Sequence, residues 1–162
     1  MHNGDMAVSI ARMSEQQSRA WLALISTAEL LPAALDAQLQ RDAQLTHYEY
    51  VLLTVLQRTG AMSLSDLAAA TNATLPRASK VVTRLRERGL LERQGSERDR
   101  RAVEIRITSD GRRTLVRATP GHLDTVHELV LDRLTDEQLE MLGDALEPVV
   151  AALDPQARYG PR

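Results

Sequence analysis

The sequence predicts a mainly α-helical protein that carries one small β-hairpin. Three observations support this fold class: apolar residues recur every three or four positions near both ends, short capped helical patterns fill the middle, and a strand-like alternation follows them. Of the 162 residues, 43% are hydrophobic and 26% are charged, which are globular proportions. Only 2% are aromatic, so the core must consist mainly of Leu, Val, Ala and Ile. Such a core suits helices packed on helices.

The first helix is predicted over residues 14–43, after a flexible tail at 1–13 that shows no periodicity. Ser14 and Gln17 have the spacing of a capping box. One apolar stripe then follows at 3-4-3-4 spacing, made of Trp21, Leu24, Ala28, Leu31 and Leu35 and extended by Leu39. Pro32 lies inside the stripe and is expected to bend the helix or restart it. So narrow a stripe on so long a helix needs another helix to cover it.

Three shorter helices are predicted next. The first lies between Thr46 and Gly60, with Glu49 completing a capping box. The second follows Ser63, and the third runs over about 74–88, with Gly89 placed just after its end. The inner face of the first should carry Tyr50, Leu53 and Leu56. At roughly 100° per residue, the buried face of the third should carry Ala78, Val81, Val82 and Leu85.

The period changes after Gly89. Residues 90–93 are strand-like, and Val103, Ile105 and Ile107 alternate with charged residues as in a half-buried strand. The polar, charged stretch 94–101 between them is predicted to be a loop. Together they form a two-stranded hairpin with a basic tip.

The C-terminal part is helical again. A helix should begin at 108–110 and continue to about Leu134, with a kink or interruption at 120–121. Thr135 and Gln138 cap a last helix, in which Pro148 should cause a kink. Its apolar stripe consists of Leu139, Leu142, Leu146, Val149 and Leu153. Residues 154–162 are predicted to be a tail.

The charge of the chain is unevenly distributed. The net charge is −2, but residues 74–101 hold nine basic and four acidic residues, a net +5, and the remainder carries −7. A concentrated basic segment in an acidic protein favours a local surface for a polyanion. The alternative is an exposed charged face with no partner.

Three helices followed by a hairpin, with a basic third helix and a basic tip, are typical of a winged helix-turn-helix that binds DNA. The outer face of the third helix offers short donors and a Lys for base edges and arginines for phosphates. Its candidate contacts are Pro76, Arg77, Ser79, Lys80, Thr83 and Arg84. The candidate contacts of the hairpin tip are Arg98, Asp99, Arg100 and Arg101.

The stretch 45–115 resembles the multiple antibiotic resistance regulator (MarR) family of bacterial transcription regulators. The resemblance rests on LTHYEYVLLTVL at 45–56, LSDLAAAT at 64–71, SKVVTRLRERGLLER at 79–93 and DRRAVEIRITSDG at 99–111. It implies that Arg101 enters the minor groove, that Asp99 orients it, and that Ser79 and Lys80 face the major groove. Pro76, and Ile107 where Leu is commoner, depart from the family pattern.

The resemblance also implies a homodimer that binds a palindromic site in double-stranded DNA and is released by a small aromatic or phenolic effector. The predicted parts are a tail (1–13), an N-terminal dimerisation helix (14–43), a winged helix-turn-helix lobe (44–108), C-terminal dimerisation helices (109–153) and a tail (154–162). The polar-aromatic candidates for the effector site are Trp21, His47, Tyr48 and Tyr50. The predicted role is that of a ligand-responsive repressor, and a constitutive regulator or activator without an effector is the alternative.

Other classes of function find little support in the sequence. There are no cysteines, which excludes thiolate chemistry, and there is no phosphate-binding Gly-rich loop or nucleophile elbow, so we predict no enzyme and no cofactor. His122 and His127 would point apart on a helix, so no metal site is predicted. No run of eighteen uncharged apolar residues occurs, so we expect no membrane span and a cytoplasmic, nucleoid-associated location. A nonspecific DNA-packaging protein should be basic overall, and a pure protein-interaction module needs no basic hairpin.

Overall fold

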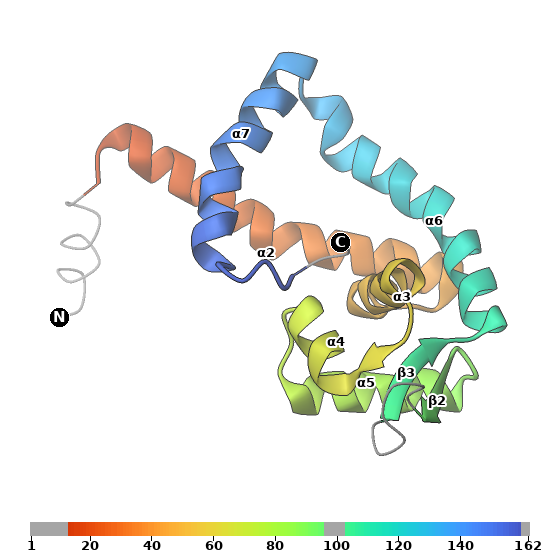
Figure 1. The fold of residues 1–162 in the computed structure, drawn as a ribbon. Coiled ribbons are helices and arrows are strands. Elements are labelled where there is room, and N and C mark those ends of the chain that lie inside the picture. The colour runs from red at the N-terminus through yellow and green to blue at the C-terminus, as the bar shows by residue number, and fades with distance from the viewer. Residues whose placement is uncertain (1–12, 96–102, 160–162) are drawn as a thin grey trace, which may run out of the picture. The chain divides into compact units, whose positions relative to one another are not determined.

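The structure is a computed structural model that describes residues 13–95 and 103–159. It is mainly helical with a small antiparallel sheet, which confirms the predicted fold class (Figure 1). In chain order the elements are α2 (Glu15–Ala43), α3 (His47–Thr59), β1 (Met62–Ser63), α4 (Leu64–Ala70), α5 (Leu75–Glu87), β2 (Leu91–Gly95), β3 (Val103–Ile107), α6 (Ser109–Leu129), the 3-10 helix η1 (Leu131–Arg133) and α7 (Asp136–Leu153). The chain divides into two compact units, residues 1–34 and 35–162.

The first unit consists, where described, of the N-terminal part of α2. The predicted capping box is present: the Ser14 backbone N–H donates to Gln17 Oε1 at 2.8 Å, and the Gln17 N–H donates to Ser14 Oγ at 3.1 Å. The apolar stripe beyond it is exposed, with Trp21 51% and Leu24 40% accessible. By length and composition α2 could also cross a membrane, the one such helix in the described ranges. Within the described part of the first unit, no other segment covers these apolar residues.

Three of the described helices contain a proline in their interior, and none of them ends at that proline. α2 continues through Pro32, α6 through Pro120 and α7 through Pro148. Of the predicted alternatives, the restart at Pro32 and the interruption at 120–121 are therefore wrong, and the bend and the kink stay predictions. All three prolines are exposed, as are the residues four positions before them, so water can reach the carbonyls that lose their helical hydrogen bonds.

The core of the second unit is built around α3. Its predicted capping box is present at Thr46 and Glu49, and it ends at Gly60 as expected. The predicted inner residues of α3 are buried, and Leu52 and Val55 are buried as well. α4 packs beside α3, α5 packs beside α4, and the end of α2 adds Leu39 to the same core. A winged lobe of this kind buries its apolar residues within one chain.

The sheet has three strands in the order β1-β3-β2, all antiparallel. The hairpin of β2 and β3 is as predicted, but β1 was not predicted, because two residues between a helix end and the next cap carry no periodicity. β2 extends to Gly95, which pairs with Val103, so 94–95 are strand rather than loop. Val103 is 54% exposed, so only Ile105 and Ile107 form the buried face of β3.

The segment after the sheet begins where predicted. The Thr108 hydroxyl accepts from the Gly111 N–H at 3.0 Å and donates to the Gly89 carbonyl at 2.7 Å. A Cβ on Gly111 would lie 2.2 Å from the Leu90 carbonyl oxygen, so α6 can approach the start of the sheet only with a glycine there. α6 ends at Leu129 and η1 follows, so the helix does not continue to 134 as expected.

The last helix, α7, begins with the predicted capping box of Thr135 and Gln138. None of its residues is buried. Leu142 is 41% exposed, Val149 42% and Leu153 81%. The helix is amphipathic, as the sequence predicts, but its apolar face is not covered by other described residues.

Candidate nucleic-acid interface

The helix predicted to enter the major groove, α5, has one face fixed in the core. Thr74 caps it by accepting from the Arg77 N–H at 3.4 Å. The four residues of the predicted buried face are 0–7% exposed: Ala78, Val81, Val82 and Leu85. The phase derived from the sequence is thus confirmed, and it determines which side chains of α5 face outward.

The outward face of α5 carries the polar candidates. Pro76, Lys80 and Thr83 are exposed, and Ser79 is half-buried. Lys80 and Thr83 are one turn apart, so they share that face. A Lys beside short hydroxyl donors suits base edges of the major groove. The half-burial of Ser79 limits its reach compared with Lys80.

The candidate Arg84 is held by a carboxylate of α3. Its Nε lies 2.9 Å from Glu49 Oε1, and Arg88 Nη1 lies 3.7 Å from the same oxygen. Glu49 is 1% exposed, and its other oxygen accepts from the Thr46 N–H at 2.7 Å. The sequence identified Glu49 only as a capping residue. The ion pair to Arg84 depends on how α3 packs against α5.

The candidate Arg77 contacts Tyr48 of α3, the residue before Glu49. Its guanidinium carbon lies 4.4 Å from the centroid of the Tyr48 ring, within the range of a cation–π contact. The Tyr48 hydroxyl in turn lies 2.9 Å from Thr71 Oγ1 at the end of α4. Both arginines that flank the outer face of α5 therefore contact the first turn of α3.

The predicted tip of the hairpin, Arg98, Asp99, Arg100 and Arg101, lies outside the described residues. The two strands that lead into and out of it are described, and they are paired as far as Gly95 and Val103. Arg106 on β3 was not a candidate; its Nη1 donates to Gln94 Oε1 at 2.6 Å, and its Nε lies 3.9 Å from Glu92 Oε1. These contacts hold its guanidinium along the strands.

The four effector candidates do not form one group. Tyr50 is buried, its ring centroid lies 4.3 Å from that of His122, and its hydroxyl lies 3.2 Å from Thr119 Oγ1. His47 stacks on His122 with 6.0 Å between ring centroids. Tyr48 contacts α4 and α5 instead, and Trp21 belongs to the first unit. The sequence missed His122, because it lies about 75 positions from His47 along the chain.

The group of His47, Tyr50 and His122 is called the histidine cluster below. Gln38 of α2 is included in it because a Cβ on Gly121, the neighbour of His122, would lie 3.2 Å from Gln38 Nε2. Gln38 is 3% exposed and its Nε2 donates to Asp42 Oδ2 at 2.7 Å, while the His47 backbone N–H donates to Asp36. Among the described residues, Gln38 Oε1 and both imidazole Nδ1 atoms are buried without a hydrogen-bond partner. The cluster is therefore a polar site with unused hydrogen-bonding capacity.

Burial sets the charge of the histidine cluster. It lowers the pKa of His47, and the nearby Asp36 carboxylate opposes this only in part. Burial also lowers the pKa of His122, and the neighbouring His47 adds to the effect. Both rings therefore favour the neutral form near neutral pH.

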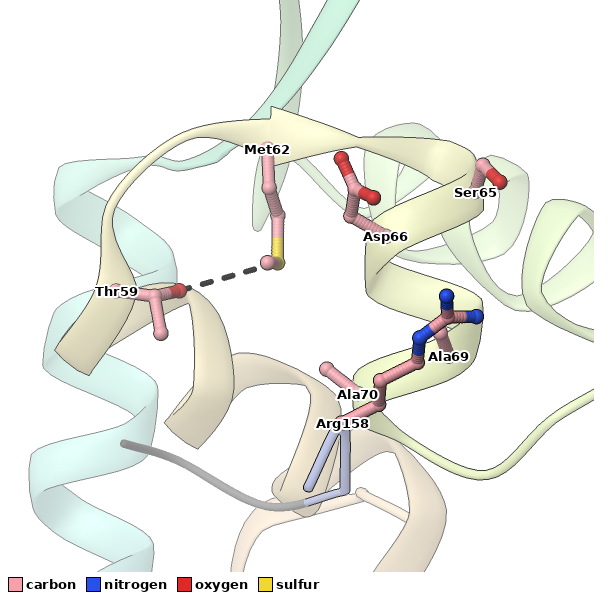
Figure 2. A pocket seen from close by; sticks show the side chains of 7 residues that line it. All are labelled: Thr59, Met62, Ser65, Asp66, Ala69, Ala70 and Arg158. Atoms are coloured by element: carbon pink, nitrogen blue, oxygen red, sulfur yellow. Dashed lines mark hydrogen bonds between the residues drawn. The ribbon is translucent and has the colours of Figure 1, made fainter. Parts of the chain in front are cut away.

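The described residues contain no group of three or more His, Cys, Asp or Glu side chains that could hold a metal ion. A pocket of about 430 Å³ lies among the end of α3, β1 and α4, with Arg158 from the segment after α7 beside it (Figure 2). Its carboxylate, Asp66, accepts from the Ser63 hydroxyl at 2.7 Å. Its lining is Thr59, Met62, Ser65, Asp66, Ala69, Ala70 and Arg158, which offers no pair of nucleophile and base.

Comparisons with known proteins identify the family of this chain. The family model described as MarR family matches residues 45–103. The transcriptional repressor MprA of Escherichia coli is 27% identical over 88 residues, which cover 53% of this chain and 50% of MprA. The chain thus spans about half the length of that curated relative.

Two solved structures are similar over most of both chains. The first is Sco3205, a MarR family transcriptional regulator from Streptomyces coelicolor in complex with DNA; it is 36% identical, with a TM-score of 0.81 over 88% of this chain and 91% of that one. The second is AbsC, another MarR family regulator from Streptomyces coelicolor; it is 30% identical, with a TM-score of 0.80 over 88% of this chain and 97% of that one. On this identity and coverage, the chain belongs to the MarR family of winged-helix transcriptional regulators.

Proposed function

We propose that this chain regulates transcription by binding a specific double-stranded DNA sequence, with α5 in the major groove and residues 98–101 at the adjacent minor groove. The observation that carries the proposal is the division of α5. Its apolar face is buried in the core, while Lys80 and Thr83 face outward between two arginines that α3 holds. The similar chain Sco3205 was solved in complex with DNA, which supports the same mode. Repression is the proposed outcome.

The proposed assembly is a homodimer on a palindromic site. The exposed apolar residues of α2 and α7 support it, since a second copy would cover faces that one chain leaves in water. Two copies would place their α5 helices in half-sites roughly 34 Å apart. For α2 we propose a second copy of the chain rather than a membrane as the partner of the apolar face, because Glu29 interrupts the apolar stretch. The proposed location is accordingly the cytoplasm.

A response to a small aromatic or phenolic effector is the finer part of the proposal. The histidine cluster supports it, because its buried, unpartnered nitrogen and oxygen atoms can accept hydrogen bonds from a phenol or a protonated acid. A constitutive regulator or activator without effector remains the alternative. A panel of phenolic and benzoic acids, added to a protein–DNA complex, separates the two. Release by no compound would favour the constitutive alternative.

The DNA-binding proposal is tested by fluorescence anisotropy. The probe is a duplex enriched from a random-sequence pool by the purified protein, compared with a scrambled duplex of equal composition. We expect at least 10³-fold tighter binding to the enriched duplex. We also expect a steep fall in affinity with salt, because several phosphates are contacted.

Lys80→Ala is the variant that tests the role of α5. It should weaken binding to the enriched duplex more than binding to the scrambled one, because Lys80 is assigned to base edges. Equal affinity of the wild-type protein for both duplexes, or for neither, would contradict the proposed function.

A further inference from the structure

Glu49 is a buried carboxylate whose two oxygens have separate partners. Oε2 accepts from the Thr46 N–H at 2.7 Å and completes the cap of α3. Oε1 accepts from Arg84 Nε at 2.9 Å and lies 3.7 Å from Arg88 Nη1. Capping alone requires only the first of these contacts. The second joins α3 to the outer edge of α5.

The contact orients Arg84 without covering it. The Arg84 side chain remains 48% exposed although its Nε is bound to a carboxylate that is 2% exposed. A guanidinium held through Nε keeps its two terminal nitrogens for another partner, and that pair of nitrogens matches a phosphate in bidentate geometry. Among the described residues, no hydrogen bond from the terminal nitrogens of Arg84 competes with such a partner.

The burial of Glu49 makes the arrangement stiff. A buried carboxylate is costly unless it is paired, so losing the contact with Arg84 would leave Glu49 with only the more distant Arg88 as a counter-charge. Arg84 is therefore restricted to few rotamers before any DNA arrives. A restricted side chain loses less conformational freedom on binding. Arg77 on the Tyr48 ring is held in a comparable way.

We propose that Glu49 is a positioning residue for DNA binding: it holds the guanidinium of Arg84 so that its free edge meets a backbone phosphate in a prepared orientation. The inference rests on the proposed function of α5. It assigns to Glu49 a role beyond the helix cap. A carboxylate near DNA could instead repel phosphates and weaken binding, so the two roles predict opposite effects when its charge is removed.

A double-variant cycle distinguishes these roles. Glu49→Gln removes the charge but keeps an oxygen for the Thr46 N–H, and Arg84→Ala removes the proposed phosphate contact. Arg84→Ala should weaken binding to the enriched duplex about tenfold, as expected for one charged hydrogen bond. Glu49→Gln should weaken it about three- to tenfold in the wild-type background and not at all in the Arg84→Ala background.

The salt dependence adds a readout that a merely structural role would not give. Arg84→Ala should reduce the slope of log K against log salt by about one unit. Glu49→Gln should leave the slope unchanged, because Arg84 still reaches the phosphate at greater entropic cost. Arg86→Ala is the matched control on the same helix, since Arg86 is exposed and forms no ion pair among the described residues; a smaller loss is expected.

NMR of the arginine Nε–H groups tests the free protein without any substitution. The Nε–H group of Arg84 should show restricted motion and slow hydrogen exchange with water, whereas the Nε–H group of Arg86 should be mobile. Equal mobility of the two would overturn the proposal, as would tighter DNA binding by Glu49→Gln or an equal loss in both backgrounds. Failure of the wild-type protein to prefer its enriched duplex would instead refute the proposed function.

Discussion

Two amphipathic helices of this chain, α5 and α7, have similar stripes and opposite surroundings. The four residues of the inner face of α5, Ala78, Val81, Val82 and Leu85, are 0–7% exposed, and no residue of α7 is buried. Spacing at 3.6 residues per turn shows that a helix has an apolar face but not what covers it. The winged lobe covers the face of α5 with its own core. The face of α7 has no such cover among the described residues, and in the proposed homodimer a second copy would cover it.

The largest expected effect comes from the covered face. Leu85 is fully buried on α5, so Leu85→Ala should lower the free energy of unfolding by about 2–5 kcal/mol. Urea denaturation followed by circular dichroism measures this. A loss below about 1 kcal/mol would mean that the core around α5 is looser than the structure shows.

The uncovered face should respond in assembly rather than in folding of the lobe. Leu142→Glu places a charge on the exposed stripe of α7 and should weaken self-association about 100-fold. Analytical ultracentrifugation over a concentration series measures the shift. Glu140→Gln, an exposed charge change two residues away, is the control and should leave the mass unchanged. A wild-type protein that is monomeric at every concentration would contradict the proposal that a second copy covers the apolar face of α7.

The hairpin tip provides a third, smaller test, because it should affect DNA binding without affecting either helix face. Arg101→Ala should weaken binding to the enriched duplex about tenfold. Its mass and its unfolding midpoint should remain those of the wild type. Unchanged affinity would show that the tip does not contact the duplex.

The smallest expected effect concerns pH. The pKa values of His47 and His122 are lowered by burial, so the unfolded chain binds more protons than the folded one. Stability should therefore decline as the pH falls through 6.5, the ordinary value for histidine, towards the lowered values in the fold. Asp36 of α2 acts on His47, Tyr50 of α3 contacts His122, and Asp42 of α2 accepts a hydrogen bond from Gln38.

Thermal unfolding at pH 7.5 and 5.5 measures this decline. His122→Gln should reduce the difference in thermal stability between pH 7.5 and pH 5.5. His127→Gln should not reduce it, because His127 is exposed and its Nδ1 lies 3.1 Å from Asp132 Oδ1, outside the histidine cluster. A wild-type stability that is equal or greater at pH 5.5 would contradict the burial of the two rings.

The local features of this fold were predictable from the sequence, and the contacts between helices were not. Caps at Thr46, Ser63 and Thr135 depend on residues three positions apart, so spacing revealed them. The phase of α5 followed from the same period. In contrast, β1 is too short for any pattern, and internal prolines in exposed helices do not end them.

The candidate site shows the same limit. The sequence identified Arg84 and Glu49 separately, 35 positions apart, and nothing in one sequence could pair them. His122 was considered only as a metal ligand, because its neighbours His47 and Tyr50 belong to another helix. Such pairs arise when tertiary packing brings two faces together, which local periodicity does not encode.

The first turn of α3 has a consequence for how a regulator of this kind is controlled. His47 and Tyr50 contact the aromatic ring of His122 on α6, while the two residues between them, Tyr48 and Glu49, grip the arginines of α5. Four consecutive residues thus contact the histidine cluster on one side and the arginines of the proposed DNA-binding face on the other. One turn of helix rises only about 5.4 Å. Under the proposed response to an effector, a small rotation of this single turn would move both arginines without a relay through the rest of the domain.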